Sequence, residues 1–181
     1  GWEAYLSNDT ASSDLINAYA ICLSGTGGST LSELRQISVP ANSSSSVTAA
    51  CQPGTLVTGG GFASEQVFTQ SQNGNGWQVY VSNPTASSRL VNVYATCLIG
   101  VQGSTTQVVK QVSVPANSTG SATATCPSGS LLTGGGFASP TADNSTQVFT
   151  QTKSGNGWVV ALVNRTNSSQ LVNAYAICLS F

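Results

Sequence analysis

The feature that most constrains this chain is an internal repeat, one copy of which lacks its front half. A complete copy opens as C-P-S-G-S-L-L-T-G-G-G-F at Cys126 and closes as Y-A-I-C at Cys178. A second complete copy runs from Cys51 to Cys97, whereas residues 1–22 repeat only the second half. Since a repeated motif folds in equivalent surroundings, the half copy needs a sheet to pack on that its own residues do not supply.

The copies align with few gaps. Trp2 corresponds to Trp77 at an offset of 75 residues, and Trp77 corresponds to Trp158 at an offset of 81. The extra residues of the last copy fall between Ser139 and Gln147, where P-T-A-D-N-S-T predicts an enlarged, exposed loop. The alignment predicts a partial repeat, formed as a β-hairpin, and two repeat domains, with the boundaries 1–25, 30–100 and 104–181.

Alternating apolar residues predict strands throughout the repeat. Trp77, Val79 and Val81 alternate with polar side chains, and the residues from Val91 to Cys97 alternate in the same way. No stretch shows a helical period, and turn residues recur at short intervals. The chain is therefore predicted to be all-β, without helices, as tandem β-sandwich-like repeats stapled by disulfides; a closed barrel and a β-prism are the alternatives.

Each complete copy has a glycine triplet inside a strand pattern, in L-V-T-G-G-G-F and L-L-T-G-G-G-F. A nucleotide-binding loop would need a helix start and a lysine after the glycines, and neither follows here. Three glycines in a strand instead indicate that another part of the chain lies against bare backbone. We predict that Trp77 and Trp158 cover the triplets, and that the Asn-Gly turn before each tryptophan closes a hairpin.

Cysteines at repeating positions predict disulfides and an oxidising compartment. Two pairing schemes respect the repeat. The first joins Cys51 to Cys97 and Cys126 to Cys178 and leaves Cys22; the second joins Cys22 to Cys51 and Cys97 to Cys126 and leaves Cys178. We favour the first scheme because it closes each complete unit on itself, and we expect Cys22 to be unpaired or to form an intermolecular bond.

The charge balance excludes several classes of partner. With a formal net charge of -1 and only 6% charged residues, the chain has no basic field to attract nucleic acid. No apolar run approaches the roughly 18 residues that a membrane span needs. Hydroxyl and amide groups must keep such a surface soluble, and its weak like-charge repulsion permits close packing of many copies.

Catalytic chemistry is poorly supported. The chain has no histidine, so it has no Ser-His or Cys-His pair, and its six acidic residues do not recur between the copies. Cysteines spaced for disulfides and the lack of histidine also argue against zinc. We expect no enzyme activity, no metal and no cofactor.

The polar face of the strands carries the remaining candidates. Tyr19, Tyr94 and Tyr175 lie opposite the apolar positions, beside asparagines, and could form a sugar-binding or interface face. Asn-x-Ser/Thr sequons add candidate glycosylation sites, as expected of an exported chain. The sequons are Asn8, Asn42, Asn117, Asn144, Asn164 and Asn167.

The combination V-P-A-N-S…C-P-x-G-x-L-x-T-G-G-G-F…G-N-G-W…Y-A-x-C resembles a domain of exported, largely uncharacterised bacterial proteins. It covers Ser38 to Cys97 and Ser113 to Cys178 fully, and residues 1–22 by half. The resemblance implies secretion and a β-rich fold without implying an activity. In the first complete copy, Cys51 is followed by Gln-Pro and not by Pro.

Together these features predict an extracellular structural protein that self-associates as part of a surface layer, sheath or filament. The half copy would join neighbours by strand addition or by another intermolecular contact, because a hairpin alone is marginally stable and exposes unpaired edges. The alternative is a secreted carbohydrate-binding module. The expected partner is the chain itself, with carbohydrate as the second candidate.

Overall fold

A computed structural model describes residues 13, 17–25, 27–64, 66–139 and 145–181. These residues form strands and no helix, so the all-β prediction is confirmed. None of them belongs to a helix long and apolar enough to cross a membrane. The strands are β1 (Ser29–Val39), β2 (Ser43–Ala50), β3 (Leu56–Ala63), β4 (Val67–Gln72), β5 (Gly76–Asn83), β6 (Arg89–Ile99), β7 (Ser104–Val114), β8 (Ser118–Thr125), β9 (Leu131–Ala138), β10 (Thr146–Ser154), β11 (Gly157–Asn164) and β12 (Gln170–Ser180).

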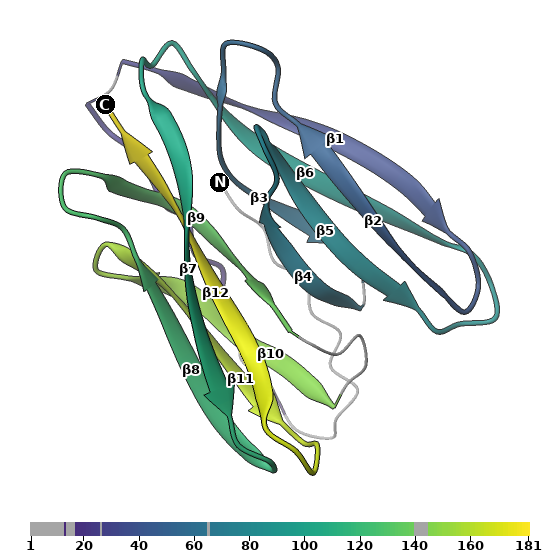
Figure 1. Cartoon of the computed structure of the whole chain (residues 1–181). Coiled ribbons are helices and arrows are strands. Elements are labelled where there is room, and N and C mark those ends of the chain that lie inside the picture. The colour runs from purple at the N-terminus through teal and green to yellow at the C-terminus, as the bar shows by residue number, and fades with distance from the viewer. Residues whose placement is uncertain (1–12, 14–16, 26, 65, 140–144) are drawn as a thin grey trace.

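The strands of the two complete copies are arranged alike (Figure 1). In the first copy β1-β6-β3 pair in one layer and β2-β5-β4 in another. In the second copy β7-β12-β9 and β10-β11-β8 repeat those two orders. The layers face each other, with β1 packed on β2 and β6 on β5, as β7 packs on β8 and β12 on β11. Each set of six strands therefore has the layered form expected of a sandwich.

One sheet continues from the first copy into the second. β4 pairs antiparallel with β9 at Thr69 opposite Ala138 and Gln70 opposite Phe137. The amide of Ser139 adds a bond of 2.8 Å to the carbonyl of Phe68. The resulting sheet has the order β2-β5-β4-β9-β12-β7. The two copies are thus joined by backbone hydrogen bonds, while their independent folding as domains 30–100 and 104–181 stays a prediction.

The cores of the two copies meet at β12. Ala176 and Cys178 belong to the second core, as their place in the second copy requires. Ile177 between them is fully buried and belongs to the first core. Because successive side chains of a strand point to opposite faces, β12 contributes one face to each core. The second copy therefore closes one side of the first.

Buried asparagines hold the ends of equivalent strands together. The Asn83 side-chain nitrogen donates to the carbonyls of Val39, Pro40 and Ser87 at 2.9–3.0 Å. Asn164 makes the equivalent bonds in the second copy. Each buried asparagine therefore satisfies the carbonyls at the end of β1 or β7, where the chain turns at a proline.

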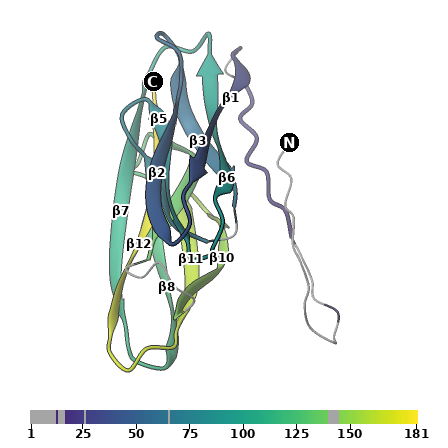
Figure 2. The same cartoon turned by 90° about the vertical axis from the view of Figure 1, so that its right-hand side faces the viewer.

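The half copy differs from its prediction where the structure describes it. Asn17–Ser24 form no strand, whereas the equivalent residues of the complete copies lie in β6 and β12. A strand needs ladder partners, and β6 and β12 each have one on both sides. Figure 2 shows this purple segment lying along the outside of the sheets. The rest of the predicted hairpin (1–12 and 14–16) and the predicted loop at 140–144 lie outside the described residues.

Candidate interaction site

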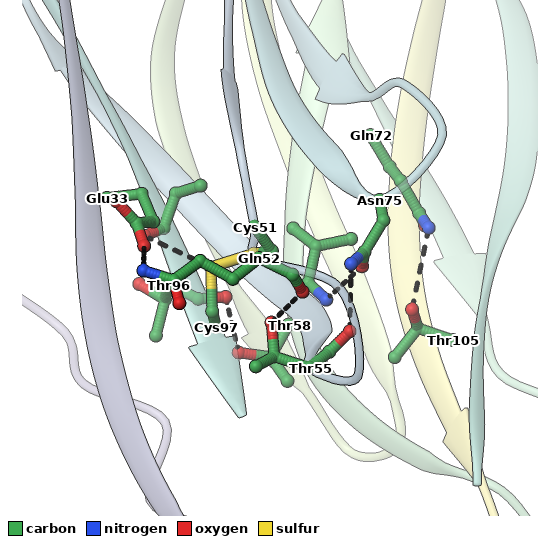
Figure 3. The surroundings of a disulfide bond; sticks show 12 residues. Glu33, Cys51, Gln52, Thr55, Thr58, Gln72, Asn75, Thr96, Cys97 and Thr105 are labelled. Carbon is green, nitrogen blue, oxygen red and sulfur yellow. Dashed lines mark hydrogen bonds between the residues drawn. A yellow bond between two sulfur atoms is a disulfide. The ribbon is translucent and has the colours of Figure 1, made fainter. Parts of the chain in front are cut away.

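The disulfides follow the favoured scheme. Cys51 is bonded to Cys97 with their Cα atoms 5.7 Å apart, and Cys126 to Cys178 with theirs 5.6 Å apart. Each bond ties the turn before a glycine-rich strand to the last strand of its copy. Figure 3 shows the first one beside a hydrogen bond of 2.9 Å from the Gln52 amide to the Glu33 carboxylate. Two disulfides are consistent with an extracellular protein.

Cys22 is the exposed free thiol that the repeat arithmetic left over. Its equivalents, Cys97 and Cys178, each bond a cysteine that precedes a glycine-rich strand. The half copy lacks that strand and that cysteine, so Cys22 has no partner of the same kind within residues 1–181.

The tryptophans cover the glycine triplets as predicted. A Cβ placed on Gly60 would overlap the ring of Trp77, and one placed on Gly135 would overlap the ring of Trp158. Trp77 has no exposed surface, whereas Trp158 is only half-buried. These glycines are therefore needed for the packing of the rings.

The two indole nitrogens differ in hydrogen bonding, as the two rings differ in burial. Trp77 Nε1 donates to Gln70 Oε1 at 3.3 Å. Gln70 Nε2 in turn donates to Gln151 Oε1 at 2.8 Å, which links β4 to β10. Among the residues that the structure describes, Trp158 Nε1 is buried without a hydrogen-bond partner. An unpaired buried donor costs stability, so the surroundings of Trp158 are less complete than those of Trp77.

A groove of about 510 Å³ lies beside Trp158. The half copy provides one wall, and the end of β10 with the turn into β11 provides the other. Ile21 reaches from the first wall onto the second core. The lining residues are Tyr19, Ala20, Ile21, Thr152, Lys153, Gly155 and Trp158.

The three tyrosines named as candidates do not come together in one site. Tyr94 lies on β6 in the sheet β1-β6-β3, and Tyr175 lies on β12 in the six-stranded sheet. Both are half-buried, while Tyr19 is 57% exposed at the groove. The structure thus offers three separate tyrosine positions and no single cluster for a sugar.

Tyr94 and Tyr175 instead mark two outward faces with the same pattern. On the first face Leu34 lies opposite Tyr94, and Gln36 donates to Asn92 at 2.7 Å. On the second face Val109 lies opposite Tyr175, and Gln111 donates to Asn173 at 3.0 Å. An exposed leucine completes each face, Leu90 on the first and Leu171 on the second. We call these the β1/β6 face and the β7/β12 face.

The structure separates the candidate glycosylation sites. Asn42, Asn117 and Asn167 are exposed. Asn164 is fully buried with its side-chain nitrogen bonded to three carbonyls, so its prediction as a glycan acceptor is wrong for the folded chain. Asn8 and Asn144 lie outside the described residues. The hidden role of Asn164 could have been suspected from Asn83, which occupies the same place in N-P-T, a form that is not a sequon.

Within the described parts of the chain, no group of three or more acidic, cysteine or histidine residues is placed to hold a metal. The side-chain hydrogen bonds between the strands join mainly amides and hydroxyls, with Glu33 and Arg165 among the charged exceptions. In comparisons with known proteins, no family model matches the chain and no curated protein matches it significantly.

Proposed function

We propose that this protein is a secreted structural subunit that associates with further copies of itself into a surface layer, sheath or filament. The half copy at residues 1–25 takes part in the contact between subunits. The chain would work outside the cell, where its disulfides persist and its uncharged polar surface meets other copies without strong repulsion.

The observation that carries the proposal is the pair of equivalent outward faces. The β1/β6 face and the β7/β12 face each expose an aliphatic residue beside a tyrosine, followed by a bonded amide pair and a leucine. Leu90 and Leu171 are 65% and 55% exposed, and Leu34 and Val109 are 57% and 52% exposed. Apolar groups that recur in register on two faces are typical of interaction surfaces.

The half copy supports the proposal independently. It adds an exposed tyrosine, Tyr19, and an exposed thiol, Cys22, outside the paired sheets. An odd cysteine in an exported protein is typical of intermolecular bonding. A contact between the half copy of one molecule and a different surface of the next is heterologous, so it can propagate as an open polymer.

Electron microscopy of the purified full chain, with light scattering in solution, tests the proposal. We expect ordered filaments or sheets from the full chain and none after deletion of residues 1–25. Cys22→Ser separates the thiol from the packing contact. Dispersed single molecules from the full chain under oxidising conditions would refute self-assembly.

The outward faces are tested with a matched pair of variants. Leu90→Lys together with Leu171→Lys places a charge on each face and should lower the extent of assembly. The control is Ser121→Lys together with Thr123→Lys, two exposed positions on β8 away from both faces. Equal assembly of the two variants would show that the faces are not contacts.

Carbohydrate binding is the second proposal, because Tyr175 combines an accessible ring with an amide neighbour. The Asn173 side chain donates to the Tyr175 hydroxyl at 3.3 Å, which orients the phenol. Rings beside amides can stack on a sugar and bond its hydroxyls. Binding on a glycan array that disappears in Tyr94→Ala and Tyr175→Ala would support this proposal over the structural one.

A further inference from the structure

The half copy is built like β12 and not like β6. Asn17–Ser24 and Asn173–Ser180 both read N-A-Y-A-I-C-L-S, whereas the equivalent part of β6 reads N-V-Y-A-T-C-L-I. The position of Ile21 is therefore taken by Ile177 in β12 and by Thr96 in β6. Ile177 is the residue that β12 buries in the first core.

Ile21 packs on the second core as Ile177 packs in the first core. It is half-buried and packs on the second core, beside Trp158. Tyr19 and Ala20, which precede it, are exposed. The half copy thus lies across the open side of the second copy, as β12 lies across the open side of the first.

One strand is missing from this second arrangement. In the first arrangement the order is β4-β9-β12, so the glycine-rich strand β9 lies between β4 and β12. β10 is the equivalent of β4, and Asn17–Ser24 are the equivalent of β12. Where β9 would lie between them, the structure has the groove beside Trp158. Within the described residues β10 pairs with β11 alone, and Asn17–Ser24 are not in a strand.

Side chains of β10 near the groove are more exposed than the equivalent side chains of β4, which has β9 beside it. Phe149 on β10 is 59% exposed, while its equivalent on β4, Phe68, is half-buried. Gln151 is half-buried, while its equivalent Gln70 is 3% exposed. The difference at Gln151, like that between the tryptophans, follows the presence of β9 beside β4. Phe68 in addition packs on Tyr80, with ring centroids 6.1 Å apart, where the second copy has Ala161.

We propose that the groove binds an extended segment of the type Leu-x-Thr-Gly-Gly-Gly-Phe from another polypeptide. The segment pairs with β10 on one edge and with Asn17–Ser24 on the other, and it orders the latter as a strand. This inference goes beyond the proposed self-assembly, because it needs a partner strand and no polymer.

The glycines of the segment are required by the site. In the first arrangement a Cβ on Gly136 would lie 3.3 Å from Trp77 Cη2 and would overlap the carbonyl oxygen of Gln70. Only glycine lets β9 approach β4 and the indole so closely. The segment bound at the groove must meet Trp158 and the backbone of Gln151 in the same way.

A second copy of this chain fits the groove poorly. Its β3 has the right composition, but β3 is paired with β6, so β6 would have to replace Asn17–Ser24. That exchange would bring Thr96 to the place of Ile21 and bury a hydroxyl against the second core. The occupant is therefore a strand free of such a sheet.

The position of Cys22 predicts that the bound segment also carries a cysteine before its glycine triplet. Cys178 is bonded to Cys126, which precedes β9 by the turn P-S-G-S. Cys22 is the equivalent of Cys178. A partner with a cysteine at that spacing before its glycine triplet would bring that thiol beside Cys22.

Binding is tested by calorimetry of the full chain with a synthetic peptide of residues 130–139, S-L-L-T-G-G-G-F-A-S. We expect saturable binding and a blue shift of tryptophan fluorescence as Trp158 loses water. The control peptide has valine in place of its third glycine, the equivalent of Gly136. Its affinity should be at least about tenfold lower. Deletion of residues 1–25 from the protein should also abolish binding.

Disulfide trapping tests the register of the segment. A peptide of residues 126–139 is mixed with the protein and oxidised glutathione, which takes up two electrons and two protons as the peptide thiol and the Cys22 thiol form one disulfide. Intact mass should show one peptide per chain. A peptide with the cysteine moved to its carboxyl end should be trapped at least about tenfold more slowly, and Cys22→Ser should prevent trapping.

Three results would overturn the inference while the protein is folded with both disulfides intact. They are no binding of the glycine peptide, equal binding of the valine peptide, or a dimer of the chain alone whose groove the peptide does not enter. The last result would make a second copy the occupant and would leave the proposed self-association standing. Binding of the peptide by a chain that never assembles would leave this inference standing alone.

Discussion

Trp77 and Trp158 occupy the same place in two copies of one motif, and their surroundings differ. Trp77 is fully buried and its nitrogen is bonded to Gln70. Trp158 is half-buried and its nitrogen has no partner. Within its own copy each tryptophan makes the same contact, because each ring lies on a glycine of its own triplet. The difference comes from outside each copy. β9 and β12 flank the first core, whereas among the described residues the second core receives Ile21 of the half copy and Val67 of β4.

The strands of the first copy do not cover its whole core, because Ile177 of the second copy belongs to that core. The two layers of a copy leave one side open, and the next copy closes it with the outer face of its last strand. The closing residue is Ile177 for the first core and Ile21 for the second.

Removing each disulfide measures how much that bond stabilises its copy by restricting the unfolded chain. The bonded cysteines are 46 and 52 residues apart, so loop entropy predicts almost equal losses of about 4 kcal/mol for Cys51→Ala with Cys97→Ala and for Cys126→Ala with Cys178→Ala. Urea denaturation in a Cys22→Ser background measures both. A gap of more than about 1 kcal/mol would place the difference in the folded cores instead.

Filling the glycine positions compares the contacts under the two rings. Gly60→Val and Gly135→Val should each destabilise by about 2–3 kcal/mol, because the new side chain meets an indole that cannot withdraw. The loss should be larger at Gly60, where Trp77 is fully buried. Thermal unfolding measures the loss, with the exposed Ala63→Val on β3 as the control. An unchanged melting temperature for Gly135→Val would contradict the tight packing of Trp158.

Exchanging the closing residue compares the two open sides directly. Ile177→Thr buries a hydroxyl in the first core and should cost about 2 kcal/mol, whereas Ile21→Thr at a half-buried site should cost about 0.5 kcal/mol. Denaturant unfolding measures both, and Thr96→Ile on the β1/β6 face is the matched reverse change. Equal losses at 177 and 21 would mean that the half copy closes the second core as fully as β12 closes the first.

Replacing indole with phenyl compares the two nitrogens. Trp77→Phe loses the bond to Gln70 and some packing, and should cost about 1–2 kcal/mol. Trp158→Phe removes a buried donor that has no partner, so its cost should be about 0.5 kcal/mol or less. Chemical denaturation of both variants checks the order. A larger loss at Trp158 would indicate that its nitrogen is satisfied in solution.

Much of each copy could be predicted from the sequence because its signals are local. Alternation predicted the strands, and the Asn-Gly turns predicted the hairpins at Trp77 and Trp158. The repeat left two disulfide schemes, and the favoured one, which closes each complete unit on itself and leaves Cys22, is the one observed. Glycines with tryptophans nearby predicted the packing of the triplets. Each of these depends on residues that are neighbours within one copy.

Contacts between copies could not be predicted in the same way. The pairing of β4 with β9 involves only two residue pairs, and no composition signal marks it. Ile177 lies on the half-polar face of its strand, where the equivalent residue of β6 is Thr96. This replacement of threonine by isoleucine was the one sign in the sequence that the face is covered in β12. The strand expected at Asn17–Ser24 was wrong because its ladder partners are not in the half copy. The candidate tyrosines were correctly placed on the outward phase, but the sequence could not tell that they lie on separate surfaces.

The position of Ile177 also sets an order of events during synthesis. The first copy leaves the ribosome first, yet the residue that closes its core is in β12, the last strand of the chain. Until that strand arrives, the first copy has an open apolar side and an unpaired β4 edge, both of which are prone to aggregation. The first copy therefore keeps this open side during synthesis until Gln170–Ser180 have been made and can pack on it.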